Sequence, residues 1–353
     1  MCNIAGYAGE KRAAPILIEM LRAQEGFDAG YYSGIATIHE GKIYHAKLTG
    51  DTQRLCDMTE AMSLPGNVGI IHGRSGPICG DDRWAHPFIG YHGDTEEIAY
   101  VANGVAGFFN NRRAAYGALA DALIKEGYDI TSRQFFEKDV YNKLSDGTTA
   151  HMSDVMCQLI MKHKDSGKKT MQAMEDAFCE MPSEIVGLLL SRSEPEKIFY
   201  SRINRPMFVS FAPHGAYLAT SAIALPGDAT EPRLLPAMSA GYVCADGEFS
   251  SPYRSTPCTV APITAKAYRD AYDIICAELK NGGCEVWCPI RQYNLAEKMD
   301  GIFPEADCNQ TTALMYDILF SLYKDGRLHI EKKDFETGLP GITARRFILG
   351  LKD

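Results

Sequence analysis

Cys2 is the residue whose position in the chain most directly suggests chemistry. The sequence opens Met1-Cys2-Asn3, and an initiator methionine is expected to be removed when a small residue follows it. Cys2 would then carry both a thiol and the α-amine of the chain, whose ordinary pKa values of about 8.5 and 7.7–8.0 lie close to working pH. Because the amine can take up the thiol proton, directly or through water, such a nucleophile needs no separate base. The alternative is an inert cysteine in a short buried strand.

Other catalytic signatures are missing from the sequence. It contains no G-x-G-x-x-G fingerprint, no P-loop, no H-E-x-x-H and no G-x-S-x-G elbow. Cys284, Cys288 and Cys308 could suggest a metal site, but the first two are spaced one residue wider than the common zinc pair and no histidine lies nearby. We therefore expect neither a metal nor a cofactor.

Composition and charge limit the class of protein. The chain has 353 residues, of which 46% are hydrophobic, and a net charge of −9. This excludes wholesale disorder, and no run approaches the roughly 20 apolar residues of a membrane helix. The acidic balance argues against nucleic-acid binding, which depends on clustered Lys and Arg. Eleven cysteines without a repeating framework, and an N-terminus without a secretory signal, predict a cytoplasmic protein.

Short β patterns interleaved with helical patterns fill the first 250 residues. Many strands, several of them joined by hairpin-length turns, predict an antiparallel-rich α/β layered fold. Strands are expected over 4–8, 35–38, 43–48, 67–71, 97–102, 184–190, 197–200, 207–211, 216–219 and 241–245. Helices are expected over 13–21, 113–125, 149–163 and 170–180.

A second domain is predicted after residue 252, so that the chain divides into 1–252 and 253–353. Residues 250–262 are rich in Ser, Thr and Pro, which is typical of a linker. Helices are expected over 264–279, 295–302 and 311–323, followed by a hairpin of 327–332 and 341–349. Three helices and a hairpin suit a winged-helix-like module. Its charges are nearly balanced, which favours a packing or partner role over DNA binding.

Four short motifs occur in a familiar order. They are M-C-N-I-A-G-Y-A-G at the start, I-H-G-R-S-G-P around Arg74, A-H-P-F around His86, and V-A-N-G at Val101–Gly104. Together they resemble the class II glutamine amidotransferase domain, an N-terminal-nucleophile hydrolase, and most closely the glutaminase half of the glucosamine-fructose-6-phosphate aminotransferases. The likeness covers residues 1–252. It implies an αββα sandwich, with two antiparallel sheets between helical layers and the nucleophile on the first strand.

The resemblance also implies a reaction and the residues that carry it. Cys2 would attack a side-chain amide carbonyl, and Asn103 with the backbone N–H of Gly104 would hold the oxyanion, which is typically worth about 10²–10³ in rate. The Cys2 amine would pass a proton to the departing ammonia, and water would then cleave the thioester. Arg74 would pair with the carboxylate of the substrate through its two-pronged guanidinium.

Two further residues are assigned to the substrate side of this site. His86, with Pro87, would shape the loop under the site, and this structural role is favoured over proton transfer. Asp154, like Asp146, is a candidate for substrate recognition, although loop and cap roles are the default for such residues.

Several departures from the family pattern fall on positions that recognise glutamine. Asn3 replaces a glycine, and Ser75-Gly76-Pro77-Ile78 replaces a Trp-Ala-Thr-His run. The usual loop over Gly26–Gly34 is also altered, and the acidic residue that normally receives the substrate ammonium aligns with Met152. Losing such a partner typically costs a few kcal/mol, so free glutamine is expected to bind poorly unless Asp154 or Asp146 compensates.

These observations lead to an amidohydrolase hypothesis and two alternatives. The first is a glutaminase-type enzyme that hydrolyses glutamine or a related small amide. The second is a catalytically degenerate amidotransferase fold that binds an amide or amino acid as a regulatory or assembly subunit. The third is an acyl- or bile-salt-amide hydrolase of the same superfamily. Roughly 100 residues remain after the first domain, too few for a sugar-isomerase half, so a separate ammonia-accepting partner protein and a homo-oligomer are both compatible with the sequence.

Overall fold

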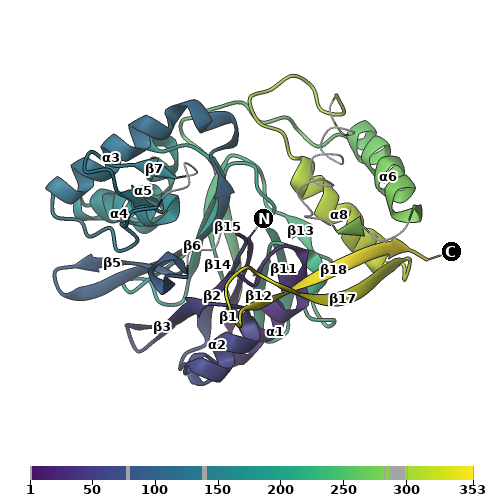
Figure 1. Ribbon diagram of the computed structural model, residues 1–353, viewed down its shortest axis with the longest axis horizontal. Coiled ribbons are helices and arrows are strands. Elements are labelled where there is room, and N and C mark those ends of the chain that lie inside the picture. Colours follow the sequence, from purple (N-terminus) through teal and green to yellow (C-terminus); the bar gives the residue numbers. More distant parts are fainter. Residues whose placement is uncertain are drawn as a thin grey trace.

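Two antiparallel sheets form the centre of the protein in a computed structural model that describes residues 2–76, 80–136, 141–281, 284–285, 299 and 301–352 (Figure 1). The first sheet has the strand order β13-β11-β12-β1-β4-β2-β3. Its strands are β1 (Asn3–Gly9), β2 (Tyr32–His39), β3 (Lys42–Thr49), β4 (Val68–Arg74), β11 (Phe208–Ala212), β12 (Gly215–Ala219) and β13 (Arg233–Leu234). The strand that begins directly after Cys2 is therefore central, with β4 and β12 as its neighbours.

The second sheet has the order β15-β14-β10-β9-β6-β5. Its strands are β5 (Phe88–His92), β6 (Thr95–Val105), β9 (Glu184–Ser191), β10 (Ile198–Arg202), β14 (Ser239–Cys244) and β15 (Gly247–Pro252). Every pair of neighbours in both sheets is antiparallel, as expected from the hairpin-length turns.

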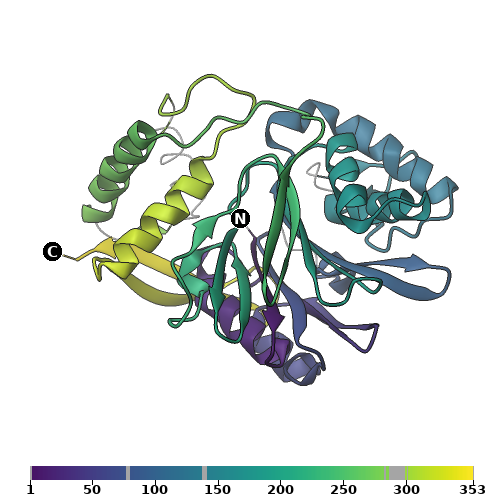
Figure 2. The same cartoon turned by 180° about the vertical axis from the view of Figure 1, so that it is seen from behind.

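Alternating side chains on the strands divide the core into layers. On β6, Ala99 and Val101 point into the apolar core between the two sheets, whereas Tyr100 and Ala102 point into the core beneath the helices. The helices α3 (Arg113–Lys125), α4 (Met152–Asp165) and α5 (Thr170–Glu180) cover this sheet, and α1 (Ala13–Gln24) covers the other, with α2 (Thr52–Met58) beside it (Figures 1 and 2). This arrangement confirms the layered α/β fold with two antiparallel sheets.

Short elements complete this part of the chain. The 3₁₀ turns are η1 (Glu25–Phe27), η2 (Ala61–Ser63), η3 (Asp82–Trp84), η4 (Gly107–Arg112) and η5 (Ala222–Ala224), and a small ladder joins β7 (Asn142–Lys143) to β8 (Thr149–Ala150). The helix expected from residue 149 begins only at Met152, because His151 acts as its N-cap and accepts a hydrogen bond at Nδ1 from the Ser153 backbone N–H.

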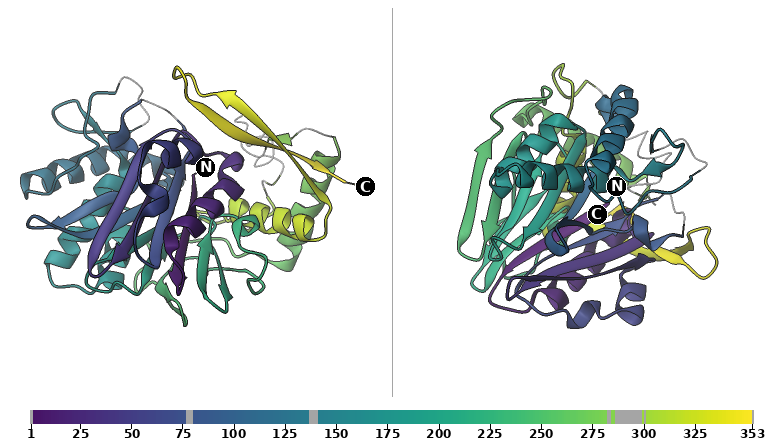
Figure 3. Two further views of the ribbon diagram at one scale, coloured as in Figure 1. Left: turned by 90° about the horizontal axis from the view of Figure 1, so that it is seen from below. Right: turned by 90° about the vertical axis from the view of Figure 1, so that its left-hand side faces the viewer.

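The C-terminal part contains α6 (Ala265–Lys280), α8 (Thr311–Lys324) and a small sheet of β16 (Cys284–Glu285), β18 (Thr343–Leu351) and β17 (Leu328–Glu336) (Figure 3). The expected hairpin is present and longer than predicted. The core of this part includes Phe27, Phe208 and Ala222 from the first 252 residues. Most of the helix expected over 295–302 lies outside the described residues, so the winged-helix comparison stays a prediction.

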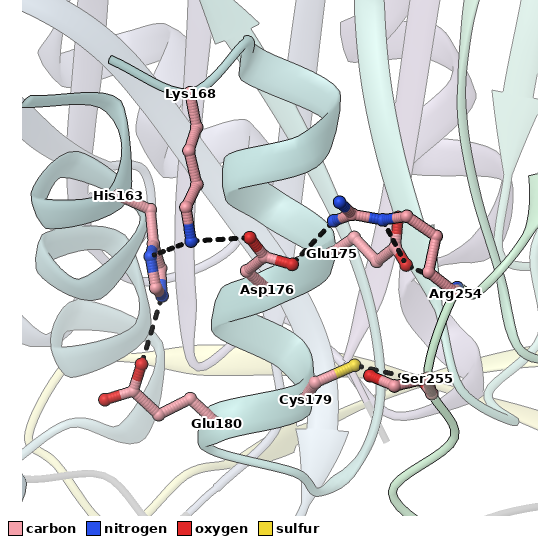
Figure 4. A network of polar contacts seen from close by, with 8 residues as sticks. All are labelled: His163, Lys168, Glu175, Asp176, Cys179, Glu180, Arg254 and Ser255. Carbon is pink, nitrogen blue, oxygen red and sulfur yellow. Dashed lines mark hydrogen bonds and ion pairs between the residues drawn. The ribbon is translucent and has the colours of Figure 1, made fainter. Parts of the chain in front are cut away.

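The segment after β15 is attached to α5 rather than loose. Arg254 binds both Glu175 and Asp176, with its Nη2 2.6 Å from Asp176 Oδ1, and the Cys179 thiol donates to the Ser255 carbonyl (Figure 4). The linker expected over 250–262 is also shorter than predicted, because β15 continues to Pro252 and pairs with β14 throughout its length. None of the described helices has the length and apolar character needed to cross a lipid bilayer.

Candidate active site

A cavity of ≈ 230 Å³ opens at the end of the two sheets where β1 begins and where β4 and β6 end. It is smaller than the ~300–1,000 Å³ pockets that hold drug-sized ligands, so it suits a small substrate. The cavity is lined by Cys2, Arg74, Ser75, Gly76, His86, Ala102, Gly104, Val105, Ala106, Arg113, Tyr141, Asn142, His151, Met152, Ser153 and Ile185.

The register of β1 against β4 brings Cys2 to His72 and Arg74. Ile4 pairs with His72 across this ladder, and Ile4 belongs to the core between the sheets. Since side chains two residues apart share a face of a strand, Cys2 and Ile4 lie on the same face as His72 and Arg74. The Cys2 Sγ is 3.6 Å from the hydroxyl oxygen of Ser75, which follows β4 directly.

Asn3 points to the opposite face of β1 from Cys2. Its side chain is fully buried, and neither of its polar atoms has a hydrogen-bond partner within the described ranges. A buried amide without hydrogen-bond partners costs free energy of folding. Asn3, which stands where the family pattern has a glycine, has no contact among the described residues that offsets this cost.

The Cys2 thiol is activated by its surroundings. Burial raises its pKa, but the nearby His72 imidazole, the charge of the chain's N-terminus and the charge of Arg74 together lower the pKa of the Cys2 thiol to about 6. His72 Nε2 lies 3.0 Å from the Ala102 carbonyl oxygen and must donate to it, because a carbonyl only accepts. The other ring nitrogen, Nδ1, is buried and has no hydrogen-bond partner among the described residues.

The oxyanion residues expected from the sequence lie at the end of β6. Asn103 shares the inter-sheet side of this strand with Ala99 and Val101, and its buried Nδ2 has no acceptor among the described residues. Gly104 lines the cavity, and a Cβ added to it would lie 2.8 Å from the Ile185 side chain, so the close approach of β9 requires glycine there. The strand thus presents a side-chain N–H donor beside a backbone one.

Arg74 is held by aromatic rings. Its guanidinium lies 4.8 Å from the ring centre of Tyr32 and 5.6 Å from that of Trp84, and it donates a hydrogen bond to the Tyr141 hydroxyl. The side chain is almost completely buried, yet Nη1 has no partner within the described residues. A fixed guanidinium with an unsatisfied donor suits an anionic group of a ligand.

His86 lies in the cavity wall, stacked on His72. The two ring centres are 3.7 Å apart, and the His151 ring is 5.1 Å from that of His86. Burial, followed by neighbouring charge, lowers the pKa of both His86 and His151 well below the usual range, so both rings are neutral at physiological pH. Neither nitrogen of His86 has a partner among the described residues.

The two candidate carboxylates lie outside the cavity lining. Asp154 is buried and accepts hydrogen bonds from the Ser132 N–H and the Thr131 hydroxyl, and burial raises its pKa. Asp146 accepts from both the N–H and the hydroxyl of Thr148. Each carboxylate therefore holds a turn, which was the default role, whereas Met152 does line the cavity.

Sequence reasoning missed the aromatic and histidine neighbours of this site. Tyr32, Trp84, Tyr141 and His151 come from four separate segments, and no local spacing connects them. One weak signal was present, because Tyr32 lies in the stretch Gly26–Gly34, where the family pattern is altered.

No metal centre is evident. Within the described ranges no group of three or more His, Cys, Asp or Glu side chains could hold an ion. Of the three cysteines considered from sequence, Cys308 lies instead 3.9 Å from the sulfur of Cys258, while Cys288 and the side chain of Cys284 are outside the described residues. Pro77 and Ile78, which belong to the altered run after Arg74, are outside them too.

Comparisons with known proteins point to one family. No family model matches the chain. The glutamine–fructose-6-phosphate aminotransferase (isomerizing) of Pyrococcus horikoshii is 26% identical to it over 224 residues, which cover 62% of this chain and 32% of that protein. The one from Legionella pneumophila (strain Paris) is 28% identical over 232 residues, or 64% and 33% of the two chains. The chain therefore matches about a third of the length of these relatives.

Solved structures support the same fold. The glutamine phosphoribosylpyrophosphate amidotransferase from B. subtilis, complexed with ADP and GMP, matches with a TM-score of 0.57 at 14% identity, covering 78% of this chain and 58% of that one. A structure described as the allosteric regulatory enzyme of purine biosynthesis matches with a TM-score of 0.59 at 15% identity and the same coverage. Over slightly less than two thirds of its length the chain is thus distantly homologous to the class II glutamine amidotransferase domain in the N-terminal region of the glutamine–fructose-6-phosphate aminotransferases, and its fold is similar to that of a solved glutamine amidotransferase.

Proposed function

We propose that this protein is a cysteine amidohydrolase of the glutamine amidotransferase type, with Cys2 as its nucleophile after removal of Met1. Its substrate is glutamine or a related small amide, and its products are ammonia and the corresponding carboxylate. The observation that carries this proposal is the convergence at one small cavity of the Cys2 thiol, with a pKa of about 6, and Arg74 Nη1, which has no hydrogen-bond partner among the described residues. Asn103, whose Nδ2 also has no partner among those residues, directly precedes the lining residue Gly104. Unsatisfied buried donors cost free energy, which a ligand would recover.

In the reaction, the Cys2 thiolate attacks the amide carbonyl carbon and forms a C–S bond. Negative charge moves to the carbonyl oxygen, where the Asn103 Nδ2 and the Gly104 N–H stabilise it. The C–N bond then breaks, and the nitrogen leaves as ammonia after taking a proton from the ammonium form of the Cys2 amine. Water attacks the resulting thioester, the C–S bond breaks, and the acid product departs while the thiol is restored.

Binding of the substrate is assigned to Arg74. Its guanidinium, oriented by Tyr32 and Trp84, pairs with a carboxylate of the substrate. His86 and His151, which are neutral, line the site without adding positive charge. Ammonia is then released or passed to a separate acceptor protein.

The experiment that tests this function measures ammonia released from glutamine, asparagine and small acyl amides by the full chain. Intact mass should show the loss of Met1, and a diazo-ketone analogue of glutamine should label Cys2 covalently. A Cys2→Ala variant that releases ammonia as fast as the wild type would refute the proposal.

A second candidate function is a binding subunit without turnover. It is favoured by Met152, which occupies the position of the family's ammonium-binding acid, and by the lack of any Asp or Glu among the described residues that line the cavity. This function predicts that glutamine or an analogue raises the melting temperature while no ammonia appears above background. Measured turnover would exclude it.

A further inference from the structure

The C-terminal hairpin of β17 and β18 lies across the segment that leads into β2 (Figures 1 and 3). The Phe347 ring meets the Phe27 ring edge to face, with centres 5.0 Å apart. A Cβ added to Gly26 would lie 2.1 Å from the Phe347 ring, so the hairpin packs directly on the backbone there. The hairpin thus contacts the stretch of chain in which the family pattern is altered.

Arg346 stabilises this contact through an ion pair and hydrogen bonds. Its guanidinium lies 3.3 Å from an Asp28 carboxylate oxygen and donates to the Ala29 carbonyl and, at 3.1 Å, to the Tyr31 hydroxyl. The same group lies against two rings that contact each other, 4.3 Å from the centre of Phe335 and 5.5 Å from that of Tyr31. One side chain of the hairpin therefore holds three residues of the segment 28–31.

That segment is bonded in turn to Arg74. The Tyr31 backbone N–H donates to the Arg74 carbonyl at 3.1 Å, and Tyr32 is the register partner of Arg74 between β2 and β4. The Tyr32 ring also supports the Arg74 guanidinium. Contacts thus run without a break from Arg346 through Tyr31 and Tyr32 to the residue assigned to the substrate carboxylate.

The hairpin also reaches the chain beyond Arg74. A Cβ added to Gly76 would lie 3.7 Å from the Tyr31 ring, and one added to Gly80 would lie 3.3 Å from the Leu339 side chain at the hairpin turn. Gly76 itself lines the cavity. The described residues on both sides of 77–79 therefore rest on the hairpin or on the tyrosine that it holds.

We propose that the C-terminal hairpin is a positioning element of the active site, in which Arg346 fixes the orientation of Arg74 through Tyr31 and Tyr32. This inference rests on the proposed function, because it assigns the hairpin to substrate binding at that site. Arg346 is not among the residues that line the cavity, so it acts only through others. The hairpin should therefore govern the affinity for a carboxylate-bearing amide, while the reactivity of the Cys2 thiol should not depend on it.

The test compares steady-state ammonia release by the wild type, Arg346→Ala and Arg74→Ala, all as full chains. A misplacement of about 1 Å caused by a mutation away from the reacting atoms can cost about 10²-fold. Arg346→Ala should therefore raise KM for glutamine at least about 10-fold, with kcat changed by less than about 2-fold. Alkylation of Cys2 by iodoacetamide, which carries no carboxylate, should proceed at the wild-type rate.

Two further variants serve as controls. Arg345→Ala removes the neighbouring guanidinium on the same strand, which pairs with Asp334 at 3.0 Å, and should leave KM unchanged. Arg346→Lys keeps the positive charge but loses the planar guanidinium that lies against the Tyr31 and Phe335 rings. Its KM should therefore fall between those of the wild type and Arg346→Ala. If Arg346→Ala does not fold, Arg346→Lys carries the comparison alone and must still raise KM.

The outcomes separate the two proposals. A wild type that turns over, an Arg74→Ala variant with raised KM and an Arg346→Ala variant with unaltered KM would overturn the positioning role and leave the proposed function standing. Absence of ammonia release from every amide tested, by the wild type itself, would remove the proposed function and this inference with it. If Arg346→Ala slows the alkylation of Cys2 by iodoacetamide as much as it impairs ammonia release, Arg346 supports the site as a whole and the inference is overturned.

Discussion

The two walls of the cavity are built differently. The nucleophile wall contains Cys2, together with His72 on β4 and Asn103 on β6, neither of which is among the lining residues. The register of β1 and β4 and the alternation along β6 set these positions. The recognition wall consists of Arg74 within aromatic rings and of Met152, the residue that the sequence analysis aligns with an acid of the family pattern. The first wall keeps the family pattern, and the second departs from it. Under the proposed function, bond breaking depends on strand register, whereas substrate choice depends more on loops that can change without disturbing the sheets.

The largest effect is expected at the nucleophile wall, from Cys2→Ser. A hydroxyl in place of the thiolate is a far weaker nucleophile near neutral pH, so ammonia release should fall by about 10⁴-fold or more. Coupled detection of ammonia measures the rate. Cys56→Ala is the matched control, since Cys56 is a partly buried cysteine on α2, outside the cavity lining, and this variant should keep full activity. Retention of more than a tenth of the wild-type rate by Cys2→Ser would place the nucleophile elsewhere.

Asn103→Ala should have the next largest effect on this wall. Removing one oxyanion donor typically lowers kcat by about 10²–10³, because the lost hydrogen bond is strongest in the transition state. KM should change little, since the donor contributes less to ground-state binding. Asn110→Ala, which alters an exposed asparagine in the following turn, should behave as wild type. If kcat is unchanged and only KM rises in Asn103→Ala, this residue binds substrate and does not stabilise an oxyanion.

His72→Asn tests how the nucleophile is activated. Thiolate is the reactive form, and with a pKa of about 6 roughly nine tenths of Cys2 is thiolate at pH 7. Without the imidazole, burial raises the pKa of the Cys2 thiol without opposition from His72, so this pKa should reach about 8.5 or more. Only a few per cent of Cys2 would then be thiolate at pH 7. The rate of iodoacetamide alkylation at pH 7 should fall by roughly 30-fold.

The pH dependence of Cys2 alkylation shows in which direction His72 shifts the pKa of the thiol. Alkylation of the wild type should be lost as pH falls through about 6, while the midpoint for His72→Asn should lie at least 2 units higher. His92→Asn is the control, because His92 pairs with Asp165 at the surface, outside the cavity lining, and should leave the profile unchanged. An unshifted midpoint in His72→Asn would assign the activation to the charges of the N-terminus and Arg74 instead.

Part of each wall could be predicted from the sequence. Arg74 and Asn103 each follow an apolar run, so their place at the ends of buried strands was predictable from pattern, and the family motifs gave them roles. The helices over 113–125 and 170–180 were predicted with the observed ends, because apolar spacing along them is regular. Such features depend on neighbours in the sequence, which is why pattern finds them.

The rest of the site depends on contacts that no local pattern encodes. Tyr32, Trp84 and Tyr141 surround one guanidinium from three separate elements or loops, and Arg346 reaches the same region from the far end of the chain. Asp154 illustrates the converse, because a carboxylate beside the expected position turned out to hold the turn at Ser132. Tertiary packing decides such roles, and one sequence does not show it.

The smallest effect is expected at the recognition wall, from Met152→Asp. Met152 lines the cavity, and none of the other described lining residues carries a carboxylate. An aspartate there would pair with the ammonium of glutamine, although its burial offsets part of the gain, so we expect kcat/KM for glutamine to rise by about 10-fold. Glutaric acid monoamide has the same amide and carboxylate but no ammonium, and its kcat/KM should fall. Met152→Asn is the neutral control. If kcat/KM changes in the same direction for both substrates, the ammonium is not recognised at this position. The departure of the recognition wall from the family pattern would then have no effect on substrate selectivity.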